Sequence, residues 1–123
     1  MKIYTSYYAR AKQFLNMTHI RISTSAPKWY PIETKAIPEL YPDFELVNAY
    51  KSGQVSEDEY IKQYTEKLSK LDKNVILQKI EQLSDGNDVL LLCYEKESDF
   101  CHRHLVAQWL GNITELTKTG LPA

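Results

Sequence analysis

The residues VLLLCYE at positions 89–95 decide the fold, because four apolar residues in succession lead into a cysteine and then into polar positions. A short, nearly continuous apolar run is typical of a parallel strand that lies in the middle of a sheet and is covered on both faces. We therefore predict a central strand from Asp88 to Glu95. The residues at its carboxyl end become the first candidates for a functional site.

The segments around this strand predict an α/β domain. Further strands are expected at 2–7, 18–24 and 113–116, and helices at 9–15, 43–51, 57–71, 72–86 and 100–111. This order predicts one small three-layer α/β domain, residues 1–123, with a mainly parallel central sheet of about four strands and flanking helices. Four prolines within 25–42 disfavour a helix or a central strand there, so this segment is expected to be an ordered loop or a lid.

Three local signals mark where helices begin and end. Ser56 and Glu59 form a capping box, which favours a helix start at Ser56. Asp72 can cap the next helix in the same way. Gly53 can adopt the positive φ that often follows the last turn of a helix, so the helix that begins near Asp43 is expected to stop there.

The composition is that of a folded, water-soluble protein. Of 123 residues, 43% are hydrophobic and 25% are charged, and the net charge is −1. No apolar run approaches the ~18 residues of a membrane-spanning helix, and the first residues show no secretion signal. We therefore expect a cytoplasmic protein without membrane contact, in which the two cysteines stay thiols.

The carboxyl end of the central strand is the expected ligand site, because ligands of parallel sheets bind where strands lead into helices. Side chains alternate along a strand, so Cys93 and Glu95 are expected on one face and Tyr94 on the other. The helix that follows is expected to begin after Ser98 or Asp99, since either side chain can serve as an N-cap.

The first turn of that helix carries three residues whose side chains can react or bind a ligand. Cys101 and His102 are expected to face the sheet, whereas His104 is expected to face solvent. Arg103 lies between them, and its guanidinium is expected over the opening. The helix amino terminus and nearby cations should lower the pKa of Cys101, whereas burial should raise that of Cys93, so Cys101 is the preferred reactive thiol.

Polar residues after the other strands extend this expected site. Ser6 follows the first strand, and Ser23 and Thr24 follow the second, with Lys28 nearby. Hydroxyls and a lysine suit a phosphate or another polar ligand. Serine and threonine are also common turn formers, so this assignment has a structural alternative.

Structural explanations also exist for the two cysteines and His102. Cys93 could be a small buried hydrophobic residue, and His102 a hydrogen-bonded core imidazole. A disulfide between Cys93 and Cys101 is geometrically feasible but is disfavoured in a reducing compartment. The two thiols, His102 and Glu95 could supply four zinc ligands, yet their spacing matches no standard finger or ribbon, so no metal or cofactor is expected.

The motif Leu92-Cys93-Tyr94-Glu95 followed by Cys101-His102-Arg103 resembles domain-of-unknown-function family number 488. The Ile22–Ser25 segment with Pro27, and the helix from Tyr60 to Leu71, fit the same pattern, so the resemblance covers nearly the whole chain. It implies the fold and the importance of the five motif positions, and a link to nucleic acid, but it supplies no substrate.

Our first functional hypothesis is a small enzyme or binding protein for an anionic or phosphorylated ligand such as a nucleotide. Arg103 and the helix N–H groups would bind the anion, His102 or Glu95 would act as acid or base, and a cysteine, preferably Cys101, would be the nucleophile. Nine residues separate Cys93 from Arg103, which excludes a tyrosine-phosphatase-like loop, and no glycine cluster indicates a Walker or dinucleotide site.

Two alternatives belong to other functional classes. The first is a nucleic-acid-associated module built on the basic N-terminal third, with Trp29 and Tyr30 as stacking residues. Its cations would be Arg10, Lys12, Arg21 and Lys28. The aromatic pair could instead anchor the proline-rich loop. The second alternative is a non-catalytic interaction protein, in which the segment from Cys93 to Arg103 is a hydrogen-bonded structural joint.

Overall fold

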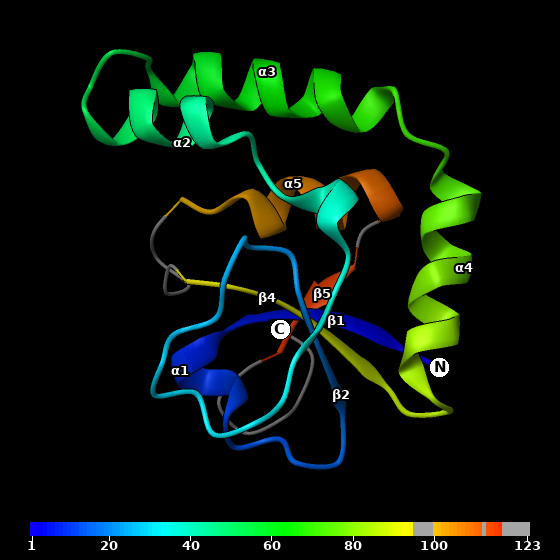
Figure 1. Ribbon diagram of the computed structural model, residues 1–123. Coiled ribbons are helices and arrows are strands. Elements are labelled where there is room, and N and C mark those ends of the chain that lie inside the picture. The colour runs from blue at the N-terminus through cyan, green and yellow to red at the C-terminus, as the bar shows by residue number, and fades with distance from the viewer. Residues whose placement is uncertain (95–99, 112, 117–123) are drawn as a thin grey trace.

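The computed structural model describes residues 1–94, 100–111 and 113–116. This part of the chain forms a parallel sheet of five strands in the order β3-β2-β4-β1-β5 (Figure 1). The strands are β1 (Ile3–Tyr7), β2 (Thr18–Arg21), β3 (Lys35–Ala36), β4 (Val89–Cys93) and β5 (Thr114–Glu115). The predicted α/β class with a parallel sheet is confirmed, and the sheet has one strand more than expected.

The central position of β4 is confirmed. Val89 pairs with Ile3 of β1 on one side and with Thr18 of β2 on the other. Every residue of β4 is buried, as the apolar run predicts for a strand covered on both faces. The end of β4 therefore lies in the middle of the carboxyl edge of the sheet, where the neighbouring strands supply further loops.

Helices cover the sheet on both faces (Figure 1). They are α1 (Tyr8–Ala11), α2 (Phe44–Lys51), α3 (Glu57–Ser69), α4 (Lys73–Ser84) and α5 (His102–Leu110), with a short 3-10 turn η1 (Pro38–Leu40). One face carries α1, which packs on Leu90 and Leu92 of β4. The other face carries the larger core, in which Val89 and Leu91 meet side chains of α2, α3, α4 and α5.

The helix boundaries follow the predicted capping signals. Ser56 Oγ accepts a hydrogen bond from the Glu59 backbone N–H at 3.1 Å, and Asp72 Oδ1 accepts from the Asn74 N–H at 2.9 Å. Gly53 has φ +81° just after α2. Among the described helices, none is long and apolar enough to cross a membrane.

Some boundaries differ from the prediction. The proline-rich segment contains a two-residue edge strand, β3, because a strand at the sheet edge pairs on one side only and tolerates nearby prolines. The helix α5 begins at His102 with Cys101 as its N-cap, so the prediction of an N-cap at Ser98 or Asp99 is wrong. Cys101 has the extended backbone that is typical of an N-cap residue, and its sulfur bonds that of Cys93 on β4.

Candidate functional site

A cleft of about 670 Å³ opens at the carboxyl edge of the sheet. The loop after β2, the end of β4, the start of α5, and the helices α2 and α3 line it. This is the edge at which parallel sheets bind ligands. Cys93, Cys101 and His102 all border the cleft, so the structure brings together three of the four residues predicted to be catalytic.

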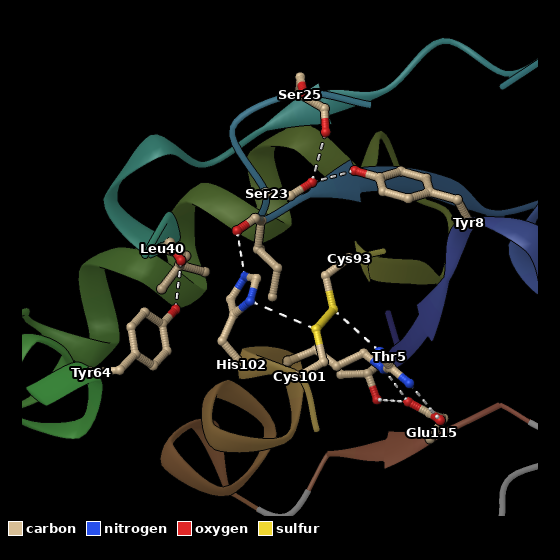
Figure 2. The surroundings of a disulfide bond; sticks show 12 residues. Thr5, Tyr8, Ser23, Ser25, Leu40, Tyr64, Cys93, Cys101, His102 and Glu115 are labelled. Carbon is tan, nitrogen blue, oxygen red and sulfur yellow. Dashed lines mark hydrogen bonds and ion pairs between the residues drawn. A yellow bond between two sulfur atoms is a disulfide. The ribbon is translucent and has the colours of Figure 1, made fainter. Parts of the chain in front are cut away.

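The sulfur atoms of Cys93 and Cys101 form a disulfide (Figure 2). Cys93 is fully buried and Cys101 is 2% exposed. The expectation that both cysteines stay thiols is wrong for this structure. The cause is the predicted proximity itself, because the end of β4 and the start of α5 direct both side chains to one point.

His102 lies beside the disulfide and is also buried. Its Nε2–H donates a hydrogen bond to the Ile22 carbonyl at 2.7 Å, which leaves Nδ1 facing Cys101 Sγ at 3.7 Å. Burial lowers the pKa of His102 to about 4, and the charge of Arg103 acts in the same direction. At neutral pH the imidazole is therefore uncharged, with a lone pair on Nδ1 directed at the sulfur.

Arg103 lies beneath the disulfide rather than over the cleft, so the predicted position of its guanidinium is wrong. It is fully buried, and it forms two contacts with the Glu115 carboxylate, Nε–Oε1 at 2.5 Å and Nη2–Oε2 at 3.2 Å. Its Nη1–H donates to Cys93 Sγ at 3.2 Å. Glu115, which also accepts a hydrogen bond from Thr5, holds this guanidinium away from the opening.

His104 is partly buried rather than directed into solvent. It borders a second, smaller hollow of about 280 Å³, together with Thr5 and Glu115. Burial lowers the pKa of His104, and the neighbouring Arg103 lowers it further. The difference from the prediction arises because β5 packs beside α5 and covers this side of the helix.

Two of the predicted hydroxyl residues, Ser23 and Thr24, line the cleft. The Ser23 hydroxyl donates to the Ser25 carbonyl at 2.9 Å and accepts from the Tyr8 hydroxyl at 2.7 Å (Figure 2). Burial raises the pKa of Tyr8 to about 12, so this hydroxyl stays a donor. Ser23 is therefore occupied in holding the loop after β2, whereas the exposed Thr24 is open to a ligand.

The remaining predicted residues do not border the cleft or lie outside the described residues. Ser6 pairs with Leu92 of β4, on the face covered by α1, and its buried hydroxyl has no hydrogen-bond partner among the described residues. Lys28 is exposed and is not among the residues that line the cleft. Glu95 lies outside the described part of the chain.

Aromatic side chains form much of the cleft wall, and the sequence reasoning did not assign them to the site. Tyr50, Tyr60 and Phe100 meet at ring distances of 5.1–5.7 Å and close one side. Phe44 and Tyr94 also border the cleft, and they are 77% and 47% exposed. The sequence does not reveal which aromatic side chains stay exposed. The helical spacing of Tyr60 and Tyr64, for example, predicts only that they pack in the core.

The residues of the basic N-terminal third differ in exposure: Lys12, Lys28 and Trp29 are exposed, whereas Arg10 and Tyr30 are engaged inside the fold. Arg10 is buried and donates to the Leu116 carbonyl at 2.9 Å. Tyr30 points inward and bonds His19, whereas Trp29 is 56% exposed with the Lys12 ammonium over its ring. The alternative in which both aromatic residues anchor the loop is thus confirmed for Tyr30 and wrong for Trp29.

The fold and the cleft define a small α/β protein with a cleft whose floor consists of two cysteines and a histidine. Residues 3–114 match the family model DUF488-N3a, described as the active DUF488-N3 subclade. The chain belongs to the DUF488 family, which confirms the resemblance seen in its motif. No curated protein and no solved structure shows a significant match to it.

Proposed function

We propose that this protein binds an anionic or phosphorylated small molecule, such as a nucleotide, in the cleft, and that it acts in the cytoplasm. The observation that carries this proposal is the make-up of the cleft, in which the exposed rings of Phe44 and Tyr94, the exposed Thr24 and a lysine surround the Cys101–His102 floor. Its volume of about 670 Å³ lies within the range of small-molecule sites, roughly 300–1,000 Å³.

The walls offer distinct contacts for the parts of such a ligand. The exposed rings of Phe44 and Tyr94 suit the flat face of a nucleobase. Lys51 on α2 and the amino end of α5, next to Cys101, favour a negative charge. Because Glu57 also lines the cleft, we expect the anionic group beside Lys51 and away from this carboxylate.

Chemistry on the ligand would involve Cys101 and His102. When the disulfide is reduced, Cys101 becomes a thiol whose sulfur faces the lone pair of His102 Nδ1. The imidazole can take the thiol proton while the sulfur attacks an electrophilic atom of the ligand, and it can return that proton to the group displaced from this atom, as in other cysteine–histidine pairs. Cys93, which accepts a hydrogen bond from Arg103, lies deeper and is less suited to attack. The predicted acid–base role of Glu95 stays a prediction.

Calorimetry with a panel of anions tests the binding proposal. The panel contains nucleoside mono-, di- and triphosphates, sugar phosphates and inorganic sulfate. We expect at least one phosphorylated compound to bind wild type and Lys62→Gln equally, because Lys62 is an exposed residue of α3 that does not line the cleft. Lys51→Gln should weaken binding about tenfold, as expected for loss of one charge-assisted contact.

A second variant separates stacking from charge. Phe44→Ala should weaken binding of a nucleotide but leave binding of a sugar phosphate unchanged, because only the nucleobase uses the ring. The proposal is overturned if no member of the panel binds, or if Lys51→Gln and Lys62→Gln bind alike. The nucleic-acid alternative is less well supported by the structure, since Arg10 and Tyr30 are engaged inside the fold.

A further inference from the structure

Three potential metal ligands meet at the floor of the cleft. The sulfur atoms of Cys93 and Cys101 and a ring nitrogen of His102 all lie within 4.8 Å of one another (Figure 2). All three side chains are buried, so the surrounding side chains restrict their positions. Two sulfurs and one imidazole are ligands that zinc commonly takes in proteins.

The orientation of His102 is that of a metal-binding imidazole. Metal-bound histidines usually donate the other ring N–H to a carbonyl or carboxylate, which fixes the tautomer and directs the lone pair at the metal. Here Nε2–H donates to the Ile22 carbonyl at 2.7 Å, and Nδ1 is directed toward Cys101 Sγ. The Ile22 carbonyl, at the end of β2, thus acts as the outer partner that such a site needs.

Cys93 has an outer partner as well. The Arg103 Nη1–H donates to its sulfur at 3.2 Å, and this contact favours the thiolate, which is the form that binds a metal. The charge of Arg103 is balanced by Glu115 rather than by the cysteine. Two thiolates can therefore neutralise the charge of a divalent cation without leaving a net charge in the buried floor.

The backbone spacing of the cysteines also suits an ion between them. Their Cα atoms are 7.2 Å apart, whereas disulfides usually span ~4.4–6.8 Å. Two thiolates on one tetrahedral zinc ion lie about 3.8 Å apart, given Zn–S bonds of ~2.3 Å. The wide spacing thus leaves the two sulfurs room to move apart and share an ion.

From these contacts we propose that Cys93, Cys101 and His102 bind a zinc ion when the protein is reduced, with the fourth position open to the cleft. Two molecules of a low-molecular-weight thiol together supply two electrons and two protons to the disulfide and are released as one disulfide, which leaves Cys93 and Cys101 as thiols. Zinc then displaces the two thiol protons. The ligand spacing in the sequence argued against a metal, because it resembles no standard finger, but three ligands with an open position are typical of a catalytic zinc site.

Cobalt substitution tests the site directly. Untagged protein is reduced with a phosphine, treated with a chelator, freed of both by gel filtration without oxygen, and titrated with Co²⁺ and then Zn²⁺. We expect one cobalt ion per chain, with thiolate-to-cobalt charge-transfer absorption and visible bands of tetrahedral cobalt, and loss of both when zinc is added. The same protein with its disulfide intact should show neither signal.

Variants assign the ligands. Cys93→Ser, Cys101→Ser and His102→Gln should each lower the affinity at least about 100-fold, the upper end of the loss seen for outer partners. His104→Gln, on the same helix but outside the cluster, should bind cobalt like wild type. The proposal is overturned if reduced wild type shows no charge-transfer band, or if His102→Gln binds with wild-type affinity.

A measurement on wild type alone tests the zinc proposal even if the variants fail to fold. Zinc should slow the alkylation of both cysteines in the reduced protein, and equal rates with and without zinc contradict the proposal. The inference concerns the same cleft as the proposed function but fails independently of it. Ligand binding is followed by calorimetry in the absence of metal, whereas cobalt absorption is recorded in the absence of any other ligand.

Discussion

Arg103 and Glu115 form a bidentate ion pair that joins α5 to β5 beneath the disulfide. The Arg103 side chain is fully buried, and that of Glu115 is 14% exposed. The structural-joint hypothesis therefore describes Arg103 well, even though the neighbouring Cys101 and His102 border an open cleft. The same motif contributes both a structural residue and the floor of the site.

Replacing Arg103 should destabilise the fold severely. Arg103→Met leaves the Glu115 carboxylate without its buried partner, and we expect the free energy of unfolding to fall by about 3–5 kcal/mol. Lys67→Met breaks the more exposed pair between Lys67 and Asp43, and should cost less than about 1 kcal/mol. Urea unfolding of both variants measures the difference, and similar losses would contradict the structural role of Arg103.

His19 should make stability depend on pH. Its Nε2–H donates to the Phe14 carbonyl at 2.7 Å, and Nδ1 accepts from the Tyr30 hydroxyl. Burial lowers the pKa of His19 below its ordinary 6.5. The unfolded chain therefore binds a proton more readily than the folded chain, so the stability contributed at neutral pH is lost as the pH falls below about 6.5.

Urea unfolding between pH 7.5 and pH 5 tests this dependence. The decrease in stability should be smaller for His19→Gln than for wild type, because the substitution removes the titrating group. Lys62→Gln should retain the wild-type decrease, since this exposed residue is not buried on folding. An unchanged decrease in His19→Gln would show that His19 does not contribute.

The N-cap of α3 should contribute measurably to stability. Ser56 Oγ accepts the Glu59 backbone N–H, and its loss leaves that donor without its cap. We expect Ser56→Ala to lower the free energy of unfolding by about 1 kcal/mol. The matched control is Ser69→Ala at the other end of α3, whose hydroxyl bonds the Glu66 carbonyl of its own helix rather than a free backbone N–H. Ser69→Ala should change stability less, and the reverse order would contradict the capping assignment.

The exposed Trp29 offers a test of the nucleic-acid alternative. Filter binding of single-stranded RNA and DNA at low salt should show no difference between wild type and Trp29→Ala, because Tyr30 bonds His19 and cannot complete a stacking pair. Binding that falls steeply with salt and is reduced in Trp29→Ala would instead favour the nucleic-acid module.

The parts of the fold and site that local sequence signals determine could be predicted. The apolar run 89–92 predicts β4, and Ser56 and Asp72 predict two helix starts, because each signal acts within a few residues of the chain. The direction of His102 toward the strand end follows from helical geometry in the same way. The meeting of Cys93 with Cys101 was predictable for a similar reason, because a strand end leads directly into the next helix.

The direction of Arg103 could not be predicted, because its partner is chosen by long-range pairing. Glu115 reaches Arg103 only after the chain turns at Gly111, where φ is +118°, and β5 pairs with β1. The aromatic wall of the cleft could not be predicted from the sequence for the same reason. Tyr50 and Phe100 meet through the packing of α2 beside the start of α5, and no spacing within either segment indicates that contact.

The place of β1 inside the sheet has a consequence for biosynthesis. This strand is synthesised before both of its neighbours, β4 and β5, and the bond between Thr5 and Glu115 spans 110 positions. In a nascent chain, β1 therefore stays without these two partners until β4 and β5 have emerged. We expect the native sheet to assemble late and slowly, as is common for folds with distant contacts, with the exposed strand a target for chaperones in the meantime.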